Sequence, residues 1–303
     1  MMMIMNTCRN SPVKIQLQHF FLHLNSMDFL KHNKHWLVID RDKRIILSPE
    51  KRCVSVSDFI ADLCRHFLMS GSQRNTDNFA WRCVYHYKLL IICIDHIILI
   101  QTSGENGIVH DTDTAREYIT HKIKWNLAYT ELLAARLAYE AAEKKDLQEL
   151  LYLEELLEAS RIPMEQREAA RKMGSRFAKT IEKLGLSISE TGIFREYLDA
   201  RKGKAVNHCC IYGVFCAEMQ ISLEEALTHY LYAQTSAIVT NCVKTIPLSQ
   251  TSGQQLLSGC YGEFDEILKD IMNRSEEDLC LSAPGFDIRG IQHEKLYSRL
   301  YMS

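Results

Sequence analysis

The sequence of 303 residues has no large excess of charge of either sign, since 36 Lys and Arg stand against 38 Asp and Glu. Proteins that bind nucleic acid or anionic lipid usually carry a clear basic excess. A long hydrophobic run is also lacking. The longest apolar stretch, residues 89–100, contains Asp95 and His96 and is much shorter than the roughly 20 residues of a spanning helix. We therefore expect no nucleic-acid partner and no membrane segment.

Paired cysteine motifs are lacking as well. The chain has 11 cysteines, which is an odd number, and none of them form a Cys-x-x-Cys spacing. The start of the chain lacks the charged, apolar and small-residue regions of a secretion signal. Disulfide frameworks belong to oxidising compartments. We therefore expect reduced thiols in a cytoplasmic protein.

Glutamate is scarce in the first hundred residues, where Glu50 is the only one. Residues 1–100 hold 13 Lys and Arg against 8 Asp and Glu, a net +5, whereas the rest of the chain holds 23 against 30, a net −7. This break divides the chain into an atypical N-terminal segment, residues 1–103, and residues 104–303. The segment is either a separate small domain, with residues 89–100 as a buried strand or helix, or a stretch that is disordered or read in the wrong frame.

After the break, the sequence signals for helix starts are consistent. Capping boxes are indicated at Thr114 with Glu117 and at Ser222 with Glu225, because a hydroxyl and a carboxylate three residues apart can satisfy the free amides of a helix start. Apolar residues recur three and four apart. Residues 222–245 are nearly free of charge after Glu225, which is typical of a central helix. These patterns predict an all-α bundle of seven or eight helices over residues 105–303.

Catalytic signatures are not found. The sequence has no phosphate-binding glycine loop with Lys and Ser or Thr, no HExxH and no GxSxG, and these are the motifs that organise common catalytic centres. Acidic pairs such as Glu154 and Glu155 are interpreted as solvated helix surface, since acid/base chemistry needs burial or a convergent partner. We predict that the chain is not an enzyme.

A metal site is the main alternative. His208, Cys209 and Cys210 are adjacent in the sequence, and imidazole with thiolate suits nickel, copper or zinc. A helical metal-binding protein or metalloenzyme using these three residues is therefore a rival hypothesis. Free cysteines are usually buried as small hydrophobic residues, so core packing is favoured for Cys210, and His208 is the candidate ligand that remains.

Two further segments are candidates for partner binding. The polar stretch 248–254 lies between two apolar helices and is explained either as a turn with an N-cap or as a loop facing a partner. The end of the chain carries residue types that are enriched in interface hot spots, although the alternative is that they simply dock on the bundle. The tail residues in question are Tyr297, Arg299, Leu300 and Tyr301.

Three stretches resemble the UreF family of urease accessory proteins. Residues 212–257 share its Tyr-Gly step, its Ser-Leu-Glu-Glu-Ala helix start and its turn, which reads VKTIPLSQTSGQ here. Residues 164–181 are similar too, and the terminal HEKLYSRLYMS resembles the end of UreF from Helicobacter-type bacteria. The resemblance covers about residues 106–303.

The resemblance implies a cytoplasmic, homodimeric, helical scaffold without catalysis of its own. Family members join UreH, also called UreD, and the GTPase UreG, and this assembly delivers nickel to the urease apoprotein. Nickel is then the cargo and not a tightly bound cofactor. The tail residues match the family's partner-binding end, and the residues of the family turn motif are Pro247, Gln250, Gly253 and Gln254.

One family feature is missing. UreF proteins carry a Phe-Pro-x-Gly and His-Ser-x-Gly-Leu-Glu motif shortly before the segment that corresponds to Gly107, and the residues up to Gln101 contain nothing like it. Together with the charge break, this favours the interpretation that residues 1 to about 103 are read in the wrong frame and join the right frame near Gly104.

Overall fold

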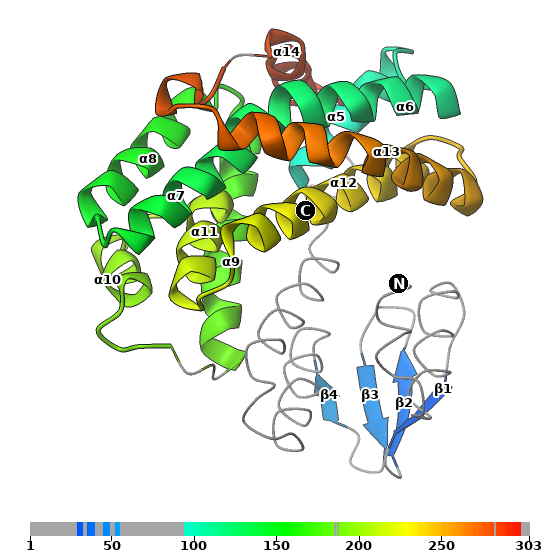
Figure 1. The fold of residues 1–303 in the computed structure, drawn as a ribbon. Helices are drawn as coiled ribbons and strands as arrows, with labels where there is room; N and C mark the ends of the chain where they lie inside the picture. The colour runs from blue at the N-terminus through cyan, green and yellow to red at the C-terminus, as the bar shows by residue number, and fades with distance from the viewer. Residues whose placement is uncertain are drawn as a thin grey trace. The chain divides into compact units, whose positions relative to one another are not determined.

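The computed structural model describes the backbone of residues 29–32, 35–39, 45–48, 52–54, 94–184, 186, 188–281 and 283–297. The chain forms two compact units, Met1–Ser72 and Gln73–Ser303, each of which is described by itself. Figure 1 shows the strands of the first unit and the helices of the second.

The described part of the first unit is a four-stranded antiparallel sheet. Its strands are β1 (Phe29–His32), β2 (His35–Ile39), β3 (Ile45–Ser48) and β4 (Arg52–Val54). They follow one another in the order β1-β2-β3-β4, with Leu37 opposite Leu30 on one side and Leu47 on the other. The rest of the predicted N-terminal segment up to residue 93 lies outside the described residues.

Helices make up the described part of the second unit, as the sequence predicts for residues 105–303. In the part of this unit that the structure describes, no strand occurs. The helices are α5 (Ile94–Glu105), α6 (Thr112–His121), the π-helix η2 (Lys122–Leu132), α7 (Leu133–Glu143), α8 (Leu147–Ser160), α9 (Met164–Leu184), α10 (Ile193–Ala200), α11 (His208–Glu218), α12 (Leu223–Thr245), α13 (Gln250–Met272), the 3-10 turn η3 (Glu276–Asp278) and α14 (Pro284–His293). The first of them, α5, runs through the predicted boundary between residues 103 and 104.

Side-chain caps start four of the described α-helices, α6, α8, α12 and α13, and the cap of α12 lies where the sequence predicts it. Ser222 accepts from the amide of Glu225, Asp146 from that of Glu149 and Ser249 from that of Ser252. The capping box at Thr114 with Glu117 is wrong. The capping residue is Asp111, whose carboxylate accepts from the Thr114 amide at 2.9 Å while its own amide donates to the Thr114 hydroxyl at 3.1 Å, because a carboxylate caps a helix at least as well as a hydroxyl.

Helix α12 lies at the centre of the helical unit, as its low charge predicts. It packs against α5, α6, η2, α7, α11 and α13, and it crosses the unit in Figure 1. The most extensive helix contact is that of α7 with α11, where a Cβ added to Gly213 would overlap the carbonyl oxygen of Ala135. None of the described helices is long and apolar enough to cross a membrane.

Candidate functional site

The family turn motif forms the corner between α12 and α13. Pro247 lies after the end of α12, and Gln250 is the first residue of α13. Gln250 and Gln254 are one helical turn apart and both exposed, whereas Gly253 between them is buried. A Cβ on Gly253 would come within 2.6 Å of Val243 Cγ2, so glycine allows the first turn of α13 to lie directly on α12.

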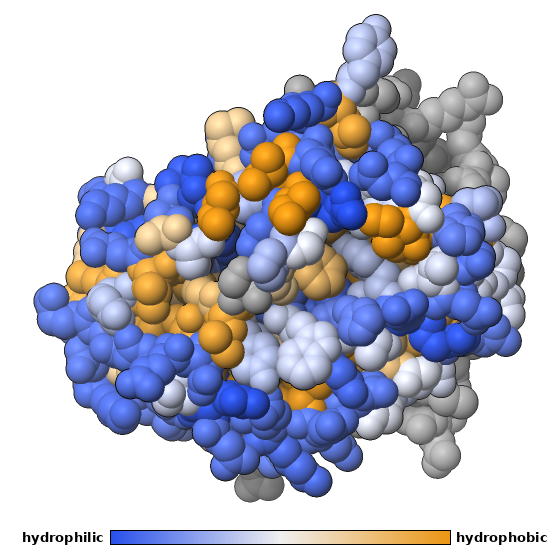
Figure 2. All heavy atoms as spheres, turned by 90° about the horizontal axis from the view of Figure 1, so that it is seen from above, coloured by the Kyte–Doolittle hydropathy of each residue, from blue (hydrophilic) through white to orange (hydrophobic). Residues whose placement is uncertain are grey.

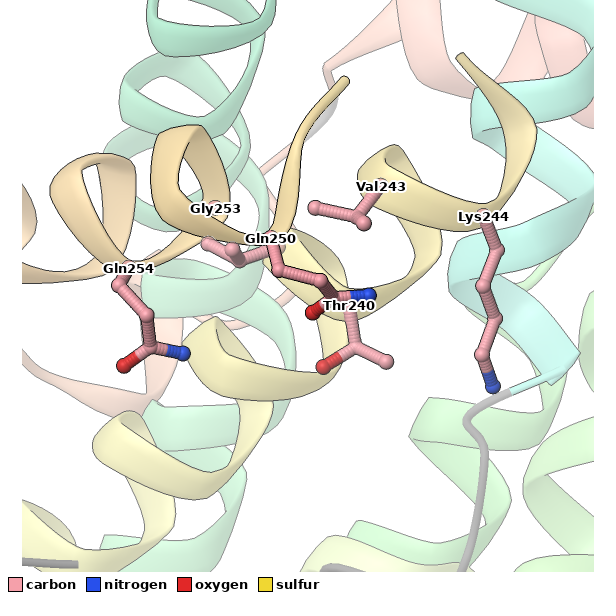
Figure 3. Close-up of a pocket in the computed structure, with 7 residues that line it drawn as sticks. Thr240, Val243, Lys244, Gln250, Gly253 and Gln254 are labelled. Atoms are coloured by element: carbon pink, nitrogen blue, oxygen red, sulfur yellow. The ribbon is translucent and has the colours of Figure 1, made fainter. Parts of the chain in front are cut away.

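The two helices line a partly open pocket at this corner. It is lined by Val239, Thr240, Val243, Lys244, Gln250, Gly253 and Gln254. Figure 3 shows the Gln250 and Thr240 side chains meeting at the centre, with Gln254 and Lys244 on opposite sides.

The chemistry of this turn pocket is that of hydrogen bonding. Its polar groups are two amides, a hydroxyl and an ammonium group, and no carboxylate, thiol or imidazole lines it. Such a donor set offers none of the side chains that usually bind transition metals, but it can donate to and accept from the backbone or side chains of another protein. The pocket is therefore suited to recognition and not to catalysis.

The C-terminal end presents a second exposed surface. Tyr297 is fully exposed, and Arg299, Leu300 and Tyr301 lie outside the described residues. Next to Tyr297 along the chain, α14 exposes Ile288 and Ile291, at 50% and 39%. Figure 2 views the molecule from the side of α14 and shows hydrophobic residues scattered in patches among hydrophilic ones.

His208 lies in the interior. Its ring stacks on Tyr230 at 5.7 Å between centroids and meets the edge of Phe177 at the same distance. The Tyr230 hydroxyl donates to Glu131 at 2.9 Å and lies 3.5 Å from His208 Nδ1. Glu131 belongs to the π-helix η2 and also faces Arg161 at 3.6 Å. The structure thus places His208 in an aromatic and polar cluster of the core.

The neighbouring thiols are core residues too. Cys209, Cys210 and Cys242 are buried, as predicted for Cys210, and burial raises the pKa of Cys242 to about 12. Among the residues that the structure describes, no three His, Cys, Asp or Glu side chains gather in a way that could hold a metal ion. The arrangement does not favour the rival hypothesis of a metal centre at His208, Cys209 and Cys210.

The interpretation of Glu154 as solvated helix surface is wrong, because the structure buries this residue. Glu155 is exposed, as predicted. The Glu154 side chain is fully buried and accepts from the Asn207 amide at 2.9 Å and from Asn207 Nδ2 at 2.9 Å. The Tyr197 hydroxyl and the Arg201 guanidinium complete its surroundings. Desolvation raises the pKa of this carboxyl, against the opposing effect of its donors. The sequence signal that could have identified Glu154 as buried is its position on the apolar face of α8, which is formed by Leu150, Leu153 and Leu157.

Comparison with known proteins identifies the family. The sequence profile of UreF matches residues 109–261, which includes the whole turn pocket. This chain belongs to the UreF family. The urease accessory protein UreF of Bacillus sp. (strain TB-90) is 33% identical over 210 residues, which are 69% of this chain and 91% of the relative.

UreF proteins are non-catalytic accessory proteins of urease maturation and part of the nickel insertion machinery. They act with the other components of a urease accessory complex. The family assignment thus confirms the predicted role as a non-catalytic accessory protein of urease maturation. The tail beyond Tyr297 lies outside the matched residues 109–261, so its role stays a prediction.

Proposed function

We propose that this chain is the scaffold on which UreH (UreD) and the GTPase UreG assemble to deliver nickel into the urease apoprotein in the cytoplasm. It acts as a homodimer within that complex and resembles the Helicobacter-type members of its family. Nickel passes through the assembly as cargo, and the chain itself holds no tightly bound cofactor.

The turn pocket is the observation that carries the proposal. It is exposed, it offers amide and ammonium groups, and it lies inside the part of the chain that matches the family. Two closely packed helices fix the backbone positions from which its polar side chains project, which lowers the entropic cost of binding a partner. The exposed Tyr297 adds an aromatic anchor at the C-terminal end.

The proposal is tested by replacing Gln250 and Gln254 with alanine and measuring capture of purified UreH and UreG by the full chain. We expect the double variant to bind at least tenfold more weakly. The matched control is Gln255→Ala, which removes an exposed amide from the neighbouring position of α13. Equal binding by the double variant and the wild type, with unchanged circular dichroism, would contradict the proposal, because the turn pocket is the observation that carries it.

A further inference from the structure

Trp125 lies on the surface of the helical unit, on the π-helix η2, and is 57% exposed. It is the only tryptophan after residue 81. Tryptophan is highly buried on average, it is enriched at the hot spots of protein interfaces, and π-helical turns are frequent at functional sites. The turn pocket between α12 and α13 does not include this residue. The exposed indole is therefore a feature to which the proposed function gives no role.

Tyr129, one turn further along η2, holds the indole in place. The two rings form an offset stack, with 6.5 Å between their centroids and 6° between their planes. Tyr129 is buried, its hydroxyl donates to Asp270 Oδ2 on α13 at 3.0 Å, and its carbonyl accepts from the Cys280 amide at 2.8 Å. The guanidinium of Arg274 lies 5.2 Å from the centre of the same ring. A rigid aromatic anchor of this kind costs a partner little entropy to bind.

Helix α13 presents a row of carboxylates beside η2. Glu263, Glu266 and Asp270 are three and four residues apart, so they lie on one face of the helix. Lys124, the neighbour of Trp125 on η2, forms ion pairs with Glu263 and, at 3.3 Å, with Glu266. The Glu266 side chain is nevertheless 75% exposed. The acidic row therefore runs alongside the turns of η2 that carry the two aromatic rings.

The charge of this surface is strongly negative. Residues 263–278 carry seven Asp and Glu against two Lys and Arg, whereas the whole chain has a net charge of −2. Adding Lys124 as a third cation leaves an excess of four negative charges, so the ion pairs within the surface do not neutralise it. Among the described residues, no three His, Cys, Asp or Glu side chains could hold a metal ion together. The cations that fit here are therefore side chains of another protein.

We propose that Trp125 and the acidic row Glu263, Glu266 and Asp270 form a docking surface for an Arg- and Lys-rich segment of a partner protein. The face of an indole attracts a guanidinium or ammonium group more strongly than other aromatic rings do. The carboxylates beside it form charge-assisted hydrogen bonds with further cations of the same segment. The surface lies on the C-terminal half of α13, and the turn pocket lies at the start of this helix. The inference therefore does not rest on the turn pocket.

The test uses the purified full chain and a fluorescein-labelled peptide of alternating Arg and Ala, beside a peptide of alternating Glu and Ala. Fluorescence anisotropy measures binding at low and at high salt. We expect the Arg peptide to bind and to bind more weakly as the salt concentration rises, because salt screens exposed charges, and we expect no binding of the Glu peptide. Absence of binding by the Arg peptide at low salt would overturn the inference.

Substitutions of Trp125 test the role of the indole. We expect Trp125→Ala to weaken binding of the Arg peptide at least tenfold and Trp125→Phe to weaken it less, because a phenyl ring retains a weaker π face. The matched control is Met164→Ala, which removes an apolar side chain of similar exposure, 50%, from α9. It should bind within twofold of the wild type. Unchanged binding by Trp125→Ala would contradict the inference.

A second pair of variants tests the position of the charge. Glu266→Lys reverses one charge of the acidic row, and Glu168→Lys makes the same change at a 48% exposed side chain on α9. We expect at least tenfold weaker binding of the Arg peptide for the first variant and a change of less than twofold for the second. Equal weakening by both would show a general attraction to the chain and would overturn the inference.

A second copy of this chain is the alternative occupant of the surface. Light scattering of Trp125→Ala beside the wild type distinguishes the two. If the oligomeric mass falls and the affinity for the Arg peptide is unchanged, the surface joins copies of the chain and the inference is wrong. An unchanged mass together with weaker peptide binding supports a surface that is open to a cationic partner.

Discussion

At the scale of single residues, Glu154 shows how a buried carboxylate organises the loop before α11. Its oxygens accept from the backbone and side chain of Asn207, and Arg201, which also contacts the Ala205 carbonyl, stands beside it. An anion at the N-terminus of a helix is favoured by the free amides and the dipole there. Glu154 therefore holds the segment 201–207 against α8.

We expect Glu154→Gln to lower the free energy of unfolding at pH 7 by about 1–3 kcal/mol, because the new NH2 group faces donors and leaves buried groups without acceptors. The pKa of Glu154 is raised in the folded state. At pH values between the pKa of Glu154 in the unfolded chain and its raised pKa in the folded chain, this carboxyl is therefore protonated in the folded chain and ionised in the unfolded chain. Protonation of Glu154 thus adds stability as the pH falls through that window.

Urea unfolding of both proteins between pH 7 and pH 4.5 measures this effect. The stability of the wild type relative to Glu154→Gln should increase as the pH falls. A difference that stays constant, or that shrinks, would show that the carboxyl is not perturbed in the way its burial implies.

At the scale of the elements, closely packed helices depend on glycine. Gly213 lets α11 lie on α7, and Gly174 lets α9 lie on the backbone of Val206. The neighbour of Gly174 is therefore the segment before α11 and not another helix. Overpacking at such contacts costs about 1–3 kcal/mol.

Gly213→Ala should therefore destabilise the protein by about 1–3 kcal/mol or more. Gly262→Ala on the exposed face of α13, where an added Cβ meets nothing within 4 Å, should stabilise it by about 0.5–1 kcal/mol, because alanine is the better helix former. Thermal melts of the two variants beside the wild type test this. Equal melting temperatures for both variants would contradict the close packing of α7 and α11.

Local sequence signals account for much of the helical unit and less of the candidate site. Hydroxyl and carboxylate caps mark the starts of α8, α12 and α13, because capping depends on residues within one turn. The burial of Glu154 depends on contacts with distant residues such as Asn207, which local patterns do not contain. The resemblance predicts the turn motif. That the motif lines one pocket with Thr240 and Lys244 follows from the packing of α12 on α13, which the sequence does not contain.

At the scale of the whole molecule, the helical part contains the family match and the candidate partner surfaces. About two thirds of this chain aligns with 91% of its Bacillus relative. Helix α5 joins the helical unit through contacts with α9, α12 and α14, and its residues 98–103 are buried there. The packed unit thus begins upstream of Gly104, inside the segment with the atypical composition.

The interpretation of residues 1 to about 103 as a wrong reading frame is tested on the nucleotide sequence. We expect that resequencing finds a slip of one or two bases near the codon for Gly104 and that its correction restores the missing family motif. The chain as written should then activate urease weakly. An intact single frame through this codon would refute the interpretation and would make the N-terminal unit a genuine additional domain.

The central claim is that this chain is a non-catalytic platform that assembles with accessory proteins through exposed features. The most direct measurement is size-exclusion chromatography of the purified full chain with UreH and UreG, beside Arg299→Ala and a chain without residues 297–303. Loss of a hot-spot arginine costs about 2 kcal/mol or more. We predict co-elution with the wild type, reduced co-elution with both variants, unchanged circular dichroism and no hydrolysis of GTP or urea by the chain alone. Failure of the folded wild type to co-elute, or turnover of GTP or urea by it at enzyme-like rates, would contradict the account.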